Sequence, residues 1–164
     1  MFGMGPFRLA GQIGVGMGMA KKYLEDYYAT YSGVKRFMDE LPVEAAARGF
    51  VSTLLGRKRF LPDLNSPNKI AQQAARRMAI NTTVQGSAAD LIKLAMIRVA
   101  EALSREKVPA RMILQVHDEI ILEARAEAAD QAAALLKNAM EKSYRLAVPL
   151  VVDPAVGKNW EEAH

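Results

Sequence analysis

The sequence predicts an α+β fold in which several helices pack on a small antiparallel sheet. Three observations lead to this expectation. Apolar residues recur at helical spacing over several long stretches, two short apolar runs flank a polar turn at Asp118, and a second pair of short runs flanks a basic turn at Lys58. The 164 residues are 51% hydrophobic, which suits one domain of ordinary size or a piece of a larger one.

The composition excludes several kinds of site. There is no cysteine, so disulfides, thiolate zinc sites and a cysteine nucleophile are ruled out, and a reducing cytoplasm suits the chain. His117 and His164 are the two histidines, which excludes a multi-histidine metal site. Any bound metal is therefore expected to be a hard ion held by carboxylates, Mg²⁺ or Mn²⁺.

The first twenty residues are apolar and rich in glycine, but they predict neither a signal peptide nor a membrane span. Pro6 and Arg8 interrupt them, and Lys21 and Lys22 follow rather than precede them. The abrupt opening suggests an internal piece of a longer chain. No membrane association is expected.

Two helices are expected next. One begins near Ala20 and carries an aromatic stripe of Tyr23, Tyr27 and Tyr31, which is more often a core face than a base-stacking platform. A second runs from Val34, is kinked by Pro42 and ends at Gly49.

The basic residues gather in the middle of the chain. Between residues 48 and 98 there are nine basic and two acidic residues, a local net charge of +7 in a chain of net charge +4. Residues 55–58 form the turn of a predicted hairpin with three basic side chains at its end. The block predicts a polyanion-binding face, and the alternative is a set of solvated basic helices.

Two consecutive helices should follow the basic hairpin. The first is expected to start at Ser66-Pro67 and to end near Ile80. The second is expected to start at Thr82, with Gln85 completing a capping box, and to run past residue 100. Gly86 in its first turns indicates close approach of another backbone or a ligand.

The stretch 114–122 predicts the second hairpin. Its turn region offers His117, Asp118 and Glu119, although tight hairpins normally turn on glycine or asparagine because positive φ is needed. Broken local rules are expected at functional sites. From these residues alone, a metal-binding catalytic turn and a solvated acidic loop are equally good interpretations. A helix over 126–144 and a final strand over Leu150–Val152 complete the expected order.

Residues 79–90, which read AINTTVQGSAAD, and residues 115–119, which read QVHDE, resemble the bacterial DNA polymerase I family, the family A polymerases. Residues 2–10, 53–62 and 157–160 also resemble family segments, in the same order. The resemblance implies the C-terminal fingers and palm part of the polymerase domain. It places fingers-side helices and the basic hairpin at about 1–80, and a long palm helix, the catalytic hairpin, a helix and a terminal strand at about 81–164.

The resemblance implies a role for each matched residue. Asp118 matches one of two aspartates that bind a pair of magnesium ions, Glu119 supports that site, and His117 lies near the primer end. Phe2 matches a nucleotide-binding position where the family usually has tyrosine. Arg57, Asn81 and Gln85 match positions that contact the primer–template duplex, which gives the basic block its partner. The further residues expected to bind DNA are Lys58, Arg59, Arg76 and Arg77 of that block.

The resemblance also implies what the 164 residues lack. No segment matches the family's first catalytic aspartate or the helix that binds the triphosphate. We therefore expect a part of a DNA-directed DNA polymerase that needs Mg²⁺ or Mn²⁺ together with the upstream aspartate, and that does not polymerise DNA as an isolated polypeptide. The expected partners are primer–template DNA and dNTP, in the nucleoid of a bacterial cytoplasm, with self-association through the exposed palm surface as a hazard.

Two rival functions stay open at this point. A non-enzymatic nucleic-acid-binding module accounts for the basic block and needs no metal. A phosphohydrolase that uses His117 and Asp118 as metal ligands is less favoured, because such sites use further histidines.

Overall fold

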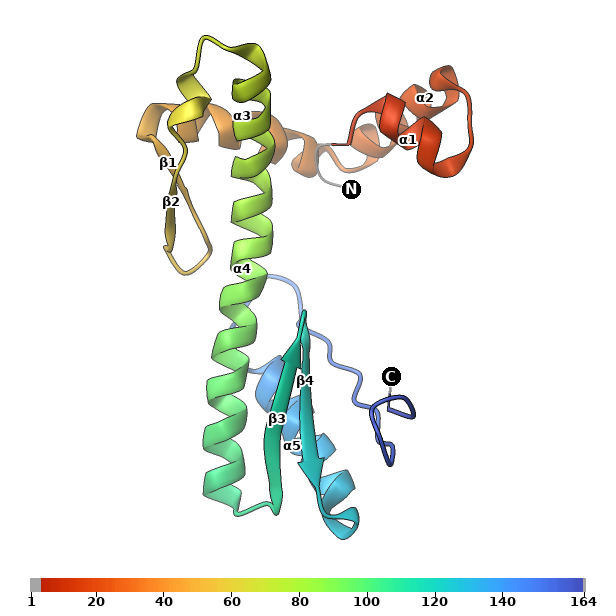
Figure 1. Ribbon diagram of the computed structural model, residues 1–164, viewed down its shortest axis with the longest axis vertical. Coiled ribbons are helices and arrows are strands. Elements are labelled where there is room, and N and C mark those ends of the chain that lie inside the picture. The colour runs from red at the N-terminus through yellow and green to blue at the C-terminus, as the bar shows by residue number, and fades with distance from the viewer. Residues whose placement is uncertain (1–3, 164) are drawn as a thin grey trace. The chain divides into compact units, whose positions relative to one another are not determined.

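The computed structural model describes residues 4–163 (Figure 1). The chain divides into two compact units, with the boundary between Ser87 and Ala88. The long helix α4 (Lys69–Glu106) contributes residues to both. The α+β prediction is confirmed, because helices combine with two small antiparallel sheets.

The first unit contains three helices and a two-stranded sheet before α4. These elements are α1 (Pro6–Ile13), α2 (Met17–Thr30), α3 (Ser32–Arg48), β1 (Phe50–Ser52), β2 (Lys58–Phe60) and a 3-10 turn (Pro62–Asn65). Gly49 has φ 79° and ends α3 in the left-handed conformation, as expected for a helix C-terminus. Small and aliphatic side chains from α3, β1, the 3-10 turn and α4 form its core: Ala45, Val51, Leu61, Leu64, Ala75 and Ala79.

The tyrosine stripe of α2 is not a core face, so that expectation was wrong. Tyr23 is 47% exposed and Tyr31 is 54% exposed, and Ala20 is the one residue of α2 that is buried. The rings of Tyr27 and Tyr31 contact each other with centroids 5.0 Å apart. Spacing alone could not distinguish an aromatic face packed on a partner from one that packs on itself.

The predicted break between two helices near residue 81 was also wrong. α4 is continuous, and the Thr83 hydroxyl donates to the Ala79 carbonyl at 3.1 Å, as an interior threonine does. Thr82 therefore caps nothing. The helix begins at Lys69 rather than at Ser66-Pro67, and Asn68 caps it: its side-chain oxygen accepts a hydrogen bond from the Ile70 N–H at 2.9 Å.

The second unit combines the later part of α4 with a hairpin and a helix. The hairpin consists of β3 (Ala110–Val116) and β4 (Glu119–Ala124), and α5 (Ala129–Glu141) follows a 3-10 turn (Ala126–Ala128). Figure 1 shows the hairpin next to α4 and α5, and buried residues of all three share one core. That core is centred on Ala95, Val99, Leu103, Ile120, Ala132 and Leu135.

The expected strand at Leu150–Val152 is absent from the described part of the chain, which corrects the predicted terminal strand. The segment is instead attached to α5 by side chains. The Val152 N–H donates to the Glu141 carboxylate at 3.1 Å, and the Lys137 ammonium donates to the Val152 carbonyl. Side chains of α5 thus satisfy both backbone groups of Val152, so this residue needs no sheet partner although the apolar run resembles a strand.

None of the helices in the described residues is both long enough and apolar enough to cross a membrane.

Candidate nucleic-acid interface and metal turn

The predicted basic hairpin is confirmed as β1 and β2 with a turn over residues 53–57. Val51 pairs with Arg59, and Ser52 pairs with Lys58. The Thr53 N–H donates to the Arg57 carbonyl at 2.9 Å, and the Thr53 hydroxyl accepts from the Arg57 N–H at 3.1 Å. This pair of hydrogen bonds across the turn brings the cationic residues 57–59 together at one end of the hairpin.

The strand pleat sends neighbouring cations of the basic hairpin to opposite faces. The Arg59 guanidinium points to α4 and donates to the Thr82 hydroxyl at 3.0 Å. Lys58 points to the other face, where its ammonium lies 4.6 Å from the centroid of the Phe50 ring. Phe60 pairs with Phe50, and it is 72% exposed. One face is thus attached to the helix, and the other presents a cation and aromatic rings to solvent.

The polar residues of α4 form the second part of this surface. Arg77, Asn81 and Gln85 recur every four residues, which places them along one side of the helix. Arg77 and Gln85 are exposed, as is Arg76, and Asn81 is half-buried. Because Arg59 is bonded to Thr82, the hairpin is attached to the helix within one turn of both amide side chains. All seven residues predicted to bind DNA lie in the first unit, which ends at Ser87.

Sequence reasoning missed the residues that join the basic hairpin to α4. They are Thr53, Thr82 and Ser87, of which Thr82 was interpreted as a helix cap. The one sequence signal for the junction was Gly86, a glycine in a helix interior.

The acidic turn at residues 117–118 lies in the second unit. Val116 pairs with Glu119, so His117 and Asp118 alone connect the two strands. His117 has φ 51°, the left-handed conformation that tight hairpins require and that glycine normally supplies. Both turn residues are exposed, and Glu119 is half-buried. The hairpin was predicted correctly. Its unusual turn residue, His117, adopts a positive φ that residues with a Cβ atom rarely adopt, so the backbone is strained there.

The donor set of this turn fits one part of a hard-metal site. The Asp118 carboxylate is exposed at the hairpin tip, and carboxylate oxygens are the ligands that Mg²⁺ prefers. Within residues 4–163 there is no group of three or more histidine, aspartate and glutamate side chains that could hold a metal. Asp118 with the neighbouring Glu119 offers carboxylate oxygens for only part of a coordination sphere, so a metal bound here would need further oxygens from elsewhere.

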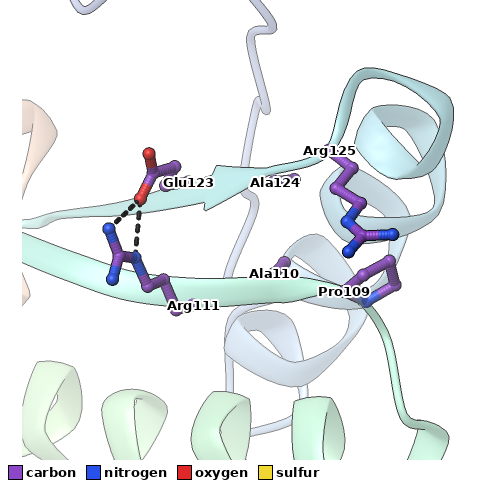
Figure 2. Close-up of a pocket in the computed structure, with 6 residues that line it drawn as sticks. All are labelled: Pro109, Ala110, Arg111, Glu123, Ala124 and Arg125. Carbon is purple, nitrogen blue, oxygen red and sulfur yellow. Dashed lines mark hydrogen bonds and ion pairs between the residues drawn. The ribbon is translucent and has the colours of Figure 1, made fainter.

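A shallow pocket lies at the opposite end of this hairpin, away from the Asp118 turn (Figure 2). Arg111 and Glu123 line it and form an ion pair at 2.6 Å, and Arg125 lies beside Pro109 at its other side. None of the predicted site residues within the described part of the chain lines this pocket.

Comparison with known proteins identifies the family. The family model described as DNA polymerase family A matches residues 1–162. The chain belongs to DNA polymerase family A. This confirms the resemblance carried by the motifs at residues 79–90 and 115–119. Phe2, the predicted nucleotide-binding residue of the family A match, lies outside the described residues.

Relatives and solved structures agree with the family A assignment. The chain is 44% identical over 164 residues to DNA polymerase I of Pseudomonas aeruginosa, covering 100% of this chain and 18% of that protein. It is 44% identical over 163 residues to the thermostable DNA polymerase I of Thermus thermophilus, covering 99% of this chain and 19% of the relative. Among solved structures it is similar to the POL domain of Pol1 from M. smegmatis in complex with DNA primer-template and dNTP. That likeness has a TM-score of 0.93 and 37% identity, and it covers 99% of this chain and 29% of the other.

The chain therefore spans about a fifth of the length of the curated relatives that it matches.

Proposed function

We propose that this chain is the part of a DNA-directed DNA polymerase that binds primer–template duplex and supplies one metal-binding carboxylate. Membership of DNA polymerase family A supports the reaction class. The structural observation that carries the DNA-binding part is the hydrogen bond between Arg59 and Thr82, which attaches a cationic hairpin beside the amide side chains of α4. The relative of known structure was determined with DNA primer-template and dNTP, which supports the same partners here.

The two kinds of side chain in the first unit suit the two parts of a duplex. Guanidinium and ammonium groups bind phosphates and supply affinity without sequence preference. We assign this role to Arg57, Lys58, Arg59, Arg76 and Arg77. Amide side chains can both donate and accept, so Asn81 and Gln85 are suited to base edges in the minor groove, where acceptors are common to all pairs.

The acidic turn supplies the residues for chemistry. Family A DNA polymerases use divalent metal ions. We propose that Asp118 holds such an ion, Mg²⁺ or Mn²⁺, together with an aspartate from outside these 164 residues. A bound pair of these ions stabilises the attacking 3′-hydroxyl oxygen and the leaving oxygen of the triphosphate. We assign Glu119, half-buried next to Asp118, to the support of that carboxylate, and His117, exposed at the tip of the hairpin, to a position near the primer end.

A binding experiment with the 164-residue protein tests the DNA-binding proposal. Fluorescence anisotropy of a labelled primer–template duplex, repeated at several salt concentrations, should show affinity that falls steeply with salt. Absence of salt-dependent binding would contradict the proposal. Duplex binding without any dependence on Asp118 in a magnesium titration would favour the alternative, a non-enzymatic nucleic-acid-binding module.

Two further expectations depend on exposed surfaces. Duplex affinity supports association with the bacterial nucleoid. Ile113 and Leu114 of β3 are 53% and 43% exposed, and this apolar surface supports self-association of the isolated polypeptide. Sedimentation velocity over a concentration series should show reversible self-association that Leu114→Ser weakens.

A further inference from the structure

We propose that Ser87 and Gly86 are positioning residues for the duplex, because they hold the turn of the basic hairpin at a set place on α4. The inference rests on the proposed DNA-binding function and deepens it. Neither residue carries a charge, and neither is assigned a contact with DNA.

The Ser87 hydroxyl joins the hairpin turn to the helix. It accepts a hydrogen bond from the Leu54 N–H at 2.8 Å, and it donates to the Thr83 carbonyl one turn earlier in α4. The bond to the helix backbone orients the oxygen, so that a lone pair faces Leu54. Removal of the hydroxyl leaves the Leu54 N–H without this acceptor and frees the first residues of the turn from the helix.

Gly86 allows the turn to approach α4 closely. A Cβ atom built at Gly86 would lie 2.8 Å from the Thr53 Cγ2 atom, which is closer than carbon atoms approach. Thr53 cannot rotate away without loss, because it is 6% exposed and its hydroxyl accepts from the Arg57 N–H at 3.1 Å. Glycine in a helix interior is less favourable than alanine. The close packing of Thr53 accounts for a glycine at this position of α4.

Three attachments therefore lie within six residues of α4. Thr82 binds Arg59, Gly86 packs on Thr53, and Ser87 binds the Leu54 backbone. Together they set where the cations of residues 57–59 stand relative to Asn81 and Gln85 on the same helix. A surface that is already arranged binds a rigid duplex without the cost of ordering the hairpin.

The first test is Ser87→Ala in the 164-residue protein, with primer–template affinity measured by anisotropy over a salt series. We expect the affinity to fall about three- to tenfold, since a hairpin that moves must be ordered again on binding. We also expect the salt dependence to become shallower by about one phosphate contact, although no charge is removed. Ser87→Thr keeps the hydroxyl and should bind like the parent.

A second test does not depend on removing a hydrogen bond. Gly86→Ala should raise the helix propensity of α4 and yet weaken duplex binding, because the new methyl displaces the turn. Adding Thr53→Ser removes the Cγ2 atom but keeps the hydroxyl that accepts from Arg57, so Thr53→Ser/Gly86→Ala should recover the parental affinity. Circular dichroism melting checks that each variant is folded. If Ser87→Ala does not fold, the comparison of Gly86→Ala with Thr53→Ser/Gly86→Ala tests the positioning role on its own.

The outcomes separate the two proposals. If the parent binds duplex in a salt-dependent way while Ser87→Ala and Gly86→Ala share its affinity and salt slope, the positioning role is overturned and the DNA-binding function stands. If the parent itself shows no such binding, both are overturned. A shallower salt slope in the uncharged variants, with recovery in Ser87→Thr and in the double variant, supports the positioning role, which a purely structural defect would not reproduce.

Discussion

Val116 and Glu119 face each other across the hairpin of the second unit, so the whole turn consists of His117 and Asp118. His117 has φ 51° and is not glycine, which makes the tip of the hairpin locally strained. Strained backbone at an exposed acidic tip is typical of a position kept for function rather than for stability.

The strain at the tip gives the first prediction. His117→Gly should raise the free energy of unfolding by up to about 1 kcal/mol, because glycine adopts positive φ without the steric cost that other residues bear. His117→Val should lower it, since β-branched side chains fit this conformation poorly. Chemical denaturation measures both. A loss of stability in His117→Gly would contradict the strain.

The second prediction concerns the cations of α4. Arg76→Ala should weaken primer–template binding about equally for different sequences and reduce the salt slope by about one. Lys22→Ala on α2 removes the same charge from a residue without an assigned DNA contact, and it serves as the matched control. Equal effects of the two substitutions would show that net charge alone, rather than the α4 surface, determines the binding.

The third prediction concerns the metal role of Asp118. Titration with Mn²⁺ should broaden the amide NMR signals of the β3–β4 turn in the parent, because the paramagnetic ion relaxes nearby nuclei when the carboxylate binds it. Asp118→Asn should abolish the broadening. Asp130→Asn on α5 removes an equivalent charge away from the turn and should leave the broadening intact. If the parent and Asp118→Asn gave the same titration, the proposal that Asp118 is a metal ligand would be contradicted.

The fourth prediction is that the 164-residue polypeptide does not extend primers. Two-metal chemistry needs carboxylates on both ions, and residues 4–163 contain no group of three or more acidic or histidine side chains that could hold a metal. A primer-extension assay with Mg²⁺ should show no incorporation above a buffer control, with an intact DNA polymerase I as the positive control. Nucleotide incorporation by the purified polypeptide would contradict this prediction.

The fifth prediction is a pH dependence at Glu141. The hydrogen bond from Lys137, followed by that from the Val152 N–H, lowers the pKa of the Glu141 carboxyl. Because the pKa is lowered, the stabilisation from the ionised, attached form is fully present above the ordinary glutamate pKa and is lost as pH falls through the folded-state pKa. The segment around Val152 should therefore detach from α5 in acid.

NMR can follow this titration through the Val152 amide signal. The shift should titrate with the lowered pKa in the parent and should not titrate in Glu141→Gln, whose side-chain oxygen still accepts but carries no charge. Glu127→Gln, at an exposed position in the same unit, is the matched control and should leave the titration unchanged. A Val152 titration that persists in Glu141→Gln would assign the shift to another group.

Much of the architecture could be predicted because it depends on local patterns. The apolar runs on either side of His117 and of Lys58 predicted both hairpins, and Gly49 marked the end of α3 correctly. Long motifs such as QVHDE and QGSAAD were sufficient to identify the family, because each is a contiguous run whose residue types and order rarely coincide by chance.

The errors share a different cause. Thr82 and Gln85 form a good capping pattern, yet they lie inside one 38-residue helix. Local sequence cannot reveal that the Thr82 hydroxyl accepts a hydrogen bond from the guanidinium of Arg59, which lies on a strand more than twenty residues away in the sequence. The run at Leu150–Val152 resembles a strand, but Glu141 and Lys137 satisfy its backbone instead.

The sequence by itself determined the family, the two hairpins and the chemical types at their turns, because these depend on motifs and on short-range alternation of apolar and polar residues. Only the tertiary structure decided that α4 is unbroken, that the tyrosine face of α2 is exposed, and that Ser87 and Gly86 hold the basic hairpin. The reason is physical. A hydroxyl side chain or a glycine can lie in a helix cap, in a helix interior or at a contact with a distant segment. Which of these roles it has depends on a partner that only folding brings near.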